Sequence, residues 1–409
     1  MMRISKMMTW WWVALVLGTL GCDRPGDKGK PAPVAAESPA YDFLTTLPFS
    51  GSPMDILTDD MDGDGRQDVA ATSHVLNYSQ IFYQKTPRRY QPGEKLDAVG
   101  FHAGDWLRWP VGADRVYLAA AEGLRQLLGF KLTQAGQMDI VAKVPALAPR
   151  NLEYFNWPGW GDSLVTTPFE AGALEFFGGF DPVQGTSARR VRITIGETSN
   201  SIRKVERVTL GDVDGDGVDE ILFASRTTGE IFKVAQPRGK NDPKAEVIFE
   251  LGESAPHQVI AVDLNGDGAK DLIVPDQVEP FQVNLLLNDG KGRFRRSAST
   301  LPFPEQQGIR YADFGRDKDD RGYLAVVGYG AIAVYQIVLP WGEGHPVPVR
   351  SIKIGSRGMS SDIVLRDLDA DGWLDLAVGY GSSEHGVAVV HGPLWEHMET
   401  LASDNFVLK

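Results

Sequence analysis

The strongest constraint on the fold is a nine-residue, aspartate-rich segment that occurs four times in the 409-residue chain. Each copy has oxygen-bearing side chains at positions 1, 3, 5 and 9 and a glycine at position 6. The oxygen-bearing residues are Asp60, Asp62, Asp64 and Asp68; Asp212, Asp214, Asp216 and Glu220; Asp263, Asn265, Asp267 and Asp271; and Asp367, Asp369, Asp371 and Asp375. Ca²⁺ takes several oxygen ligands at once, and glycine permits the sharp bend that brings alternate side chains together. We therefore predict four calcium-binding loops, with solvated turns as the alternative.

Short apolar runs follow the four segments and distinguish them from the calcium loop of EF-hands. That loop needs Glu at position 12 and a following helix, whereas position 12 here is Ala71, Phe223, Val274 or Val378. Runs such as residues 221–225 have the length and apolar content of buried strands. Each predicted loop therefore joins two strands.

The spacing of the segments predicts further, weaker copies. The second and third begin 51 residues apart, the first and second 152, and the third and fourth 104, which leaves room for three more copies. Degenerate copies occur near residues 104–114, 155–162 and 313–321. The last has Asp313 and Asp317 at positions 1 and 5 but Gly315 and Arg321 at positions 3 and 9, so we predict no metal there. The chain thus contains seven repeats of about 50 residues.

Each repeat has room for four strands. The fourth repeat shows them best, at residues 207–210, 220–225, 230–234 and 246–251. Repeating units of four strands and about 50 residues are blades of a β-propeller, and they bury their faces by stacking around an axis. We therefore predict an all-β fold, a seven-bladed propeller over residues 41–409. We expect residues 41–47 to close the ring beside residues 385–392, with residues 405–408 as the competing candidate.

The pattern Asp-x-Asp-Gly-Asp-Gly-x-x-Asp followed by an apolar strand resembles the FG-GAP repeat, also called the VCBS repeat. This repeat builds integrin α-subunit propellers and many exported bacterial proteins. The resemblance covers residue 41 to the C-terminus and implies calcium loops between the first two strands of a blade, on one rim. It also implies that partners often bind at the opposite rim. Integrin-like adhesion is not implied, because the Phe-Gly and Gly-Ala-Pro signatures are mostly absent.

A basic start and an apolar run precede the repeats. Arg3 and Lys6 lie just before an apolar run at residues 7–21. This run is too short for a comfortable membrane span and is typical of a secretory signal peptide. The run ends at Cys22 in a Leu-Gly-Cys context that resembles a bacterial lipobox. We predict a signal peptide over residues 1–21, lipidation of Cys22 and an exported protein anchored to a bacterial membrane, with ordinary cleavage nearby as the alternative.

The same region sets two further expectations. Cys22 is the only cysteine, so no disulfide is expected. Residues 22–40 are rich in Pro, Gly, Lys and Ala and have no apolar period, so we expect a flexible tether between the lipid and the propeller.

Aromatic residues accumulate where the second and third repeats lack the metal pattern. Trp106, Trp109, Trp157 and Trp160 are the tryptophans concerned. Exposed on neighbouring loops, they would stack on sugar rings or peptide side chains, which makes them candidate ligand-binding residues. The alternative is that they pack between blades and replace metal with apolar contact.

Charge and the lack of catalytic motifs narrow the function. The formal net charge is −13 and there is no basic cluster, so nucleic acid is not an expected partner. The chain has no Gly-x-Ser-x-Gly, phosphate-loop or His-Glu-x-x-His motif. We predict a non-catalytic binding or scaffold module for an extracytoplasmic protein or glycan, with calcium either structural or bridging to an acidic ligand. The alternative is a carbohydrate-active lyase or hydrolase, which acidic residues converging with Arg or His at the propeller axis would favour.

Overall fold

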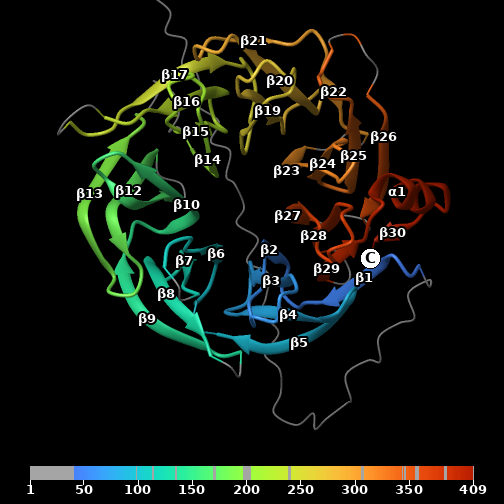
Figure 1. Ribbon diagram of the computed structural model, residues 1–409, viewed down its shortest axis with the longest axis horizontal. Coiled ribbons are helices and arrows are strands. Elements are labelled where there is room, and N and C mark those ends of the chain that lie inside the picture. The colour runs from blue at the N-terminus through green and yellow to red at the C-terminus, as the bar shows by residue number, and fades with distance from the viewer. Residues whose placement is uncertain are drawn as a thin grey trace, which may run out of the picture. The chain divides into compact units, whose positions relative to one another are not determined.

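Seven four- or five-stranded sheets, almost entirely antiparallel, are arranged around one axis and contain all the described strands (Figure 1). The structure, a computed structural model, describes residues 41–408 except 98, 113–114, 134–135, 169–171, 197–203, 238–240, 305–307, 343, 345–346, 355–358 and 382–384. The predicted signal peptide, Cys22 and the tether lie outside the described residues. The predicted seven-bladed propeller is confirmed.

In the first six blades, strand order follows the sequence from the axis outward (Figure 1). The first blade contains β2 (Pro53–Asp59), β3 (Asp68–Ser73), β4 (Ser79–Thr86) and β5 (Arg89–Leu96). The second contains β6 (Ala103–Arg108), β7 (Tyr117–Ala121), β8 (Gln126–Leu132) and β9 (Met138–Pro145). The third contains β10 (Pro149–Trp157), β11 (Gly161–Pro168), β12 (Ala173–Asp181) and β13 (Thr186–Thr194). The fourth contains β14 (Val208–Gly211), β15 (Glu220–Ala224), β16 (Glu230–Val234) and β17 (Ala245–Glu250).

The last three blades depart from this plan: the fifth and sixth each gain a short strand, and the seventh has no outer strand from its own repeat. The fifth contains β18 (Ile260–Val262), β19 (Asp271–Pro275), β20 (Gln282–Asn288) and β21 (Phe294–Arg296), and the short β22 (Leu301–Pro302) pairs with β20. The sixth contains β23 (Ile309–Arg316), β24 (Gly322–Gly328), β25 (Ala331–Ile337) and β26 (Val349–Ile354). The seventh contains β27 (Met359–Arg366), β28 (Asp375–Gly381) and β29 (His385–Val390).

Ring closure uses the N-terminal strand. β1 (Leu44–Pro48) pairs antiparallel with β29, with Thr46 opposite Ala388, and becomes the outer strand of the seventh blade. The predicted closure by residues 41–47 is therefore confirmed. The competing segment instead forms β30 (Val407–Leu408), which pairs parallel with β26 in the sixth blade.

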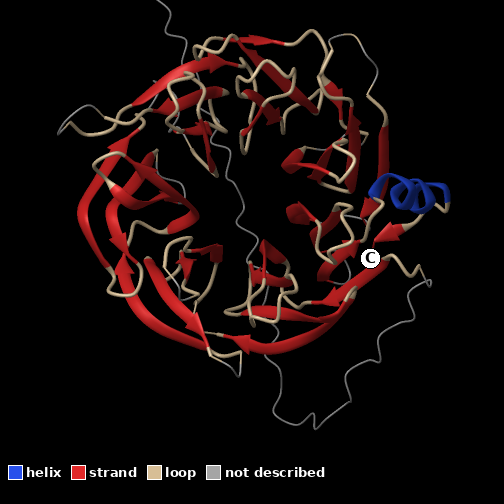
Figure 2. Cartoon of the chain, viewed as in Figure 1, coloured by secondary structure: helices blue, strands red, loops and turns tan. Residues whose placement is uncertain are grey.

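One helix, α1 (Leu394–Ser403), separates β29 from β30 (Figure 2). It buries Leu394, Met398 and Leu401. Among the described residues, no helix is both long enough and apolar enough to cross a membrane.

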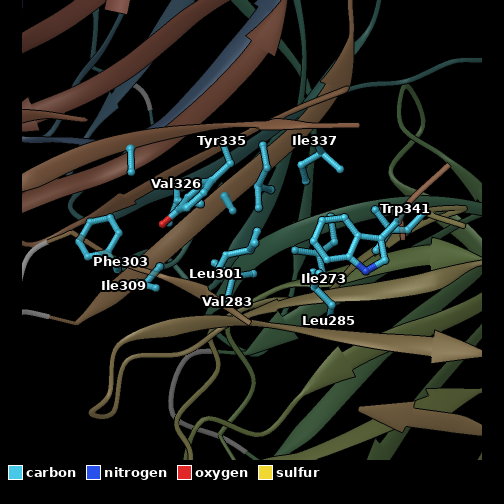
Figure 3. Close-up of a cluster of buried hydrophobic side chains, with 14 of the residues drawn as sticks. Ile273, Val283, Leu285, Leu301, Phe303, Ile309, Val326, Tyr335, Ile337 and Trp341 are labelled. Atoms are coloured by element: carbon cyan, nitrogen blue, oxygen red, sulfur yellow. The ribbon is translucent and has the colours of Figure 1, made fainter. Parts of the chain in front are cut away.

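The hydrophobic core lies between neighbouring blades. Second strands such as β19 and β28 are buried along their whole length, whereas every second residue of the outer strand β13 is exposed. A strand in the middle of a blade is covered by blades on both faces, which explains its continuous apolar sequence. Figure 3 shows one interface, where Ile273 and Leu285 of the fifth blade pack against Val326 and Tyr335 of the sixth.

The tryptophans of the second and third blades belong to these cores. Trp106, Trp109, Trp157 and Trp160 are only 3%, 5%, 1% and 8% exposed. Trp157 and Trp160 contact each other edge to face, with ring centroids 5.7 Å apart. The expectation that they are exposed for ligand stacking is wrong, because the neighbouring blade covers them.

We expect Trp157→Phe to lower stability without affecting any ligand. The Trp157 indole N–H donates to the Asp219 carbonyl at 2.9 Å, so phenylalanine would lose this hydrogen bond and leave a cavity where the buried indole lay. The expected cost is about 1–3 kcal/mol in the free energy of unfolding, measured by denaturant titration. Trp395→Phe, in a half-buried residue stacked on Arg350, is the matched control and should cost less than about 0.5 kcal/mol. Equal losses in the two variants would contradict the assigned role.

The three degenerate repeats differ in detail from their predicted boundaries. Trp106 lies in β6 and Trp157 in β10, so strand occupies part of the segments expected to be loops. In the sixth blade Asp313 also lies in a strand, and the turn is the shorter segment from Asp317 to Arg321. Asp317 caps that turn by accepting N–H donors from Asp319 and Arg321, and it pairs with the Arg321 side chain.

Candidate functional site

The four aspartate-rich loops lie between the first and second strands of the first, fourth, fifth and seventh blades. In each, the position-1 carboxylate accepts backbone N–H groups within its own loop. Asp212, for example, accepts from Gly215 at 2.7 Å and from Gly217 at 2.8 Å. Gly217 has a φ of +85°, a conformation that favours glycine and explains why position 6 is glycine in every copy.

The position-9 carboxylate is buried and ties the loop to its blade. One oxygen accepts the N–H of position 2 at 2.8 to 3.0 Å in all four loops. In three of them the other oxygen accepts an N–H at the end of the third strand or just beyond it, from Gln84, Asn288 and Gly392. Burial raises the pKa of Asp68 to about 6 and that of Glu220 to about 7.

The loop side chains fit a hard cation. Oxygens of Asp60, Asp62 and Asp68 lie within 4.8 Å of one another, as do oxygens of Asp367, Asp369 and Asp371. The donors in these two groups are all carboxylate oxygens, the ligand type that Ca²⁺ prefers.

Basic side chains already neutralise position 3 in three loops. Lys85 Nζ lies 2.6 Å from Asp62, Lys233 Nζ lies 2.7 Å from Asp214, and Arg88 contacts Asp369. Among the described residues, no Lys or Arg side chain pairs with the acids of the third loop, where position 3 is Asn265. The loops therefore differ in how much positive charge an incoming cation must displace.

A second polar feature encircles the axis, and we call it the channel belt. It has one residue per blade: Asp55, Asp105, Asn151, Arg207, Gln258, Tyr311 and Asp362. Most members bond the innermost strand of the following blade: Asp105 accepts the Leu152 N–H at 2.9 Å, and Gln258 donates to the Ala312 carbonyl at 2.6 Å. The last contact joins the seventh blade to the first, where Asp362 accepts the Ile56 N–H at 2.9 Å.

Arg207 is the one belt residue that reaches across the axis. From the fourth blade its Nη2 donates to Asp362 at 2.7 Å and to Asp55 at 3.2 Å, in the seventh and first blades. Its guanidinium also lies 4.2 Å from the centre of the Tyr311 ring in the sixth blade. One side chain thus connects four blades.

Three belt carboxyls hold protons more strongly than usual. Burial, followed by the nearby Asp105 carboxylate, raises the pKa of Asp55 to about 7. Burial likewise raises the pKa of Asp362 to about 7, although Arg207 opposes it, and that of Asp105 to about 6.

A pocket opens at the belt on the side away from the aspartate loops. Its residues, such as Pro53 and Asp105, lie near the start of the innermost strands, whereas the loops follow the ends of those strands. Its empty volume is about 510 Å³, including space open to solvent. The charged and polar residues that line it include Asp55, Asp105, Arg150, Glu206, Arg207 and Arg310.

Charge pairing organises the pocket wall. Arg150 pairs with Glu206 at 3.2 Å, and Arg226 also contacts that carboxylate. Burial tends to raise the pKa of Glu206, but Arg150, His257 and Arg226 hold it below its usual value. Burial lowers the pKa of His74, so this lining imidazole is neutral near pH 7.

The sequence analysis missed the belt and the pocket, although a signal was present. Asp55, Arg207, Gln258 and Asp362 each lie five residues before the first aspartate of a loop. A polar residue at that fixed offset, inside an otherwise apolar strand, could have been found by aligning the repeats.

Comparisons with known proteins agree with this architecture. Residues 212–274 match the FG-GAP-like repeat family. Human cartilage acidic protein 1 is 27% identical over 181 residues, which are 42% of this chain and 26% of that protein, and the mouse protein is 26% identical over the same length. The match thus spans about a quarter of these relatives. A solved protein from Lactobacillus plantarum superimposes with a TM-score of 0.51 at 12% identity, over 70% of this chain and 81% of that chain, and shows the fold alone.

Proposed function

We propose that this propeller with FG-GAP-like repeats is a calcium-stabilised, non-catalytic module that binds a carboxylated glycan of the cell envelope. The observation that carries the proposal is the pocket at the channel belt, where Arg150, Arg207 and Arg310 line one cavity together with carboxylates. Guanidinium groups bind carboxylates through paired N–H donors. Asp105, Asn151 and Glu206 offer the oxygens that sugar hydroxyl groups need as acceptors.

The pocket fits a sugar better than a peptide side chain. Pro53, Met54 and Tyr311 are the main apolar groups that line it, and the Tyr311 ring already contacts Arg207 and Arg310. Peptide recognition usually relies on apolar pockets for alternate side chains.

Calcium would act on the opposite side of the blade, without contacting this ligand. Asp60, Asp62 and Asp68, with the equivalent residues of the fourth and fifth blades, would hold it, and the bound ion would neutralise carboxylates and fix the loop between two strands. Sites with Kd of about 10⁻⁴–10⁻³ M fill outside cells, which agrees with the proposed export and lipid anchoring at Cys22.

A binding assay with uronate oligosaccharides tests the proposal. We expect calcium-loaded full chain to bind them in isothermal titration calorimetry and Arg310→Gln to weaken binding by about tenfold, the value of one charged hydrogen bond. Arg293→Gln is the control, because its side chain is 75% exposed and lies in the fifth blade away from the pocket. Binding of neutral sugars or acidic peptides alone, or equal affinity in both variants, would overturn the glycan assignment.

The channel belt supports one second candidate function, a carbohydrate-active enzyme. Asp55 and Asp105 share the pocket, and their raised pKa values resemble the paired carboxyl groups that cleave glycosidic bonds. Against it, Asp105 accepts N–H groups from Asn151 and Leu152, and Asp55 is bound to Arg207, so both have structural partners. Release of new reducing ends from acidic polysaccharides, lost in Asp105→Asn, would favour the enzyme.

A further inference from the structure

The seventh blade's loop differs from the other three because a buried histidine faces its carboxylates. His391 follows β29 and is fully buried, with 0% exposure. Its Nδ1 lies 3.6 Å from Asp375 Oδ1 and 3.9 Å from Asp369 Oδ2. The three residues place ligand atoms within 4.8 Å of one another.

Two of the polar atoms in this group have no hydrogen-bond partner among the described residues. His391 Nδ1 and Asp369 Oδ1 are both buried without one. The Nδ1–carboxylate distances exceed the roughly 2.7–3.2 Å of a hydrogen bond. Two ligands that bind one Zn²⁺ tetrahedrally at about 2.0–2.2 Å are separated by about 3.4 Å, close to the spacing seen here.

The contact made by Nε2 of His391 leaves Nδ1 as the nitrogen that would bind a metal. Thr45 Oγ1 donates to the Arg88 carbonyl at 3.3 Å, so the same oxygen is left as an acceptor for His391 Nε2, 3.1 Å away. A neutral imidazole that donates from Nε2 carries its lone pair on Nδ1. That lone pair would face two carboxylates, an arrangement that a metal ion between them would stabilise.

Arg88 occupies the outer side of the same loop. Its Nε contacts Asp369 Oδ2, and its Nη2 lies 3.0 Å from Asp371 Oδ2 and 3.3 Å from the Gly392 carbonyl. The guanidinium neutralises the exposed Asp371 carboxylate and Oδ2 of the buried Asp369 side chain, so Oδ1 is the Asp369 oxygen left to bind a metal. The inner part keeps a mixed nitrogen and oxygen donor set, which suits a transition metal better than Ca²⁺.

We propose that His391, Asp369 and Asp375 form a binding site for one first-row transition-metal ion of the Zn²⁺ class. The site lies where the ring closes, because Thr45 belongs to β1 and Arg88 to the first blade. The ion would fix the closing strand to the seventh blade. It would be distinct in chemistry from the ions of the three other loops.

Zinc titration of the full chain, freed of metal and held in excess Ca²⁺, tests this site. We expect one equivalent of Zn²⁺ to bind, and His391→Gln to weaken binding by at least about tenfold, the loss that follows even from removing an outer partner of a metal ligand. The control is His257→Gln, a buried histidine that bonds Gln277 at the fifth blade, which should leave zinc affinity unchanged. Equal affinity in His391→Gln and wild type, or no saturable zinc, would overturn the proposal.

Two further measurements keep the test informative if His391→Gln does not fold. Arg88→Gly removes the competing guanidinium at a position whose φ is +65°, and we expect it to tighten zinc binding several-fold. Zinc-edge X-ray absorption of wild type should show one imidazole nitrogen among oxygen ligands. An all-oxygen zinc shell, or displacement of zinc by Ca²⁺ at equal concentration, would show that this loop is an ordinary calcium loop instead.

Discussion

Arg207→Ala is expected to lower the free energy of unfolding by about 3–5 kcal/mol at pH 8, the cost of removing one partner from a buried ion pair. The substitution leaves Asp55 and Asp362 buried at the axis without the guanidinium that bonds both. It also removes the stacking contact with Tyr311. Denaturant titration followed by circular dichroism measures the loss.

The loss should depend on pH in a defined direction. The folded-state pKa of both carboxyls is raised to about 7, so the folded state binds more protons than the unfolded state between about pH 4 and 7. These two groups therefore favour folding at low pH, and that contribution is lost as the pH rises to about 7. Arg207 lowers both pKa values, so its removal raises them further. The stabilising contribution of the two protonated carboxyl groups then persists to higher pH before it is lost. Arg207→Ala should thus be less destabilising at pH 5 than at pH 8.

Two companion variants separate this effect from general damage. Adding Asp362→Asn to Arg207→Ala removes one unpaired charge while an amide oxygen can still accept the Ile56 N–H, so part of the stability should return. Arg293→Ala, at an exposed pair with Asp289, should leave stability almost unchanged. Equal losses at pH 5 and pH 8, or no recovery in the double variant, would show that Arg207 acts only through packing.

The sequence predicted those features that repeat along the chain. The aspartate loops fix the ends of first strands and the starts of second strands, and the 51-residue spacing locates even repeats that have lost the metal pattern. Ring closure could also be predicted, because residues 41–47 have the pattern of an outer strand but lie before the first repeat.

Features that depend on ring closure could not be predicted in this way. Arg207 contacts Asp55 and Asp362, which are 152 and 155 residues away, only because the fourth blade faces the junction of the seventh and first. The burial of Trp157 depends on which blade packs against it. Arg88 enters the seventh-blade loop from a hairpin of the first blade, and no periodic pattern marks it.

Ca²⁺ is expected to raise the melting temperature of the full chain by more than about 10 °C relative to chelator. At about 10 mM Ca²⁺, a hundredfold above a Kd of about 10⁻⁴ M, one site contributes about 2.7 kcal/mol. The loops of the first, fourth and fifth blades together would contribute about 8 kcal/mol. In a propeller of this length, that free energy corresponds to a rise in melting temperature of more than about 10 °C. Differential scanning calorimetry at matched ionic strength measures it.

Variants at position 5 can separate calcium binding from the intrinsic structure of each loop. Asp64, Asp216 and Asp267 are exposed, so replacing any one with Ala should cost little in chelator but remove about a third of the calcium-dependent rise. Lys233→Gln should increase the rise, because it frees the Asp214 carboxylate that the ammonium now binds through both oxygens. Asp242→Ala, an exposed acid outside the loops, should leave the rise unchanged. If calcium has no effect on wild type, the loops are turns held by their backbone hydrogen bonds and basic neighbours alone, and the fold needs no ion on that side.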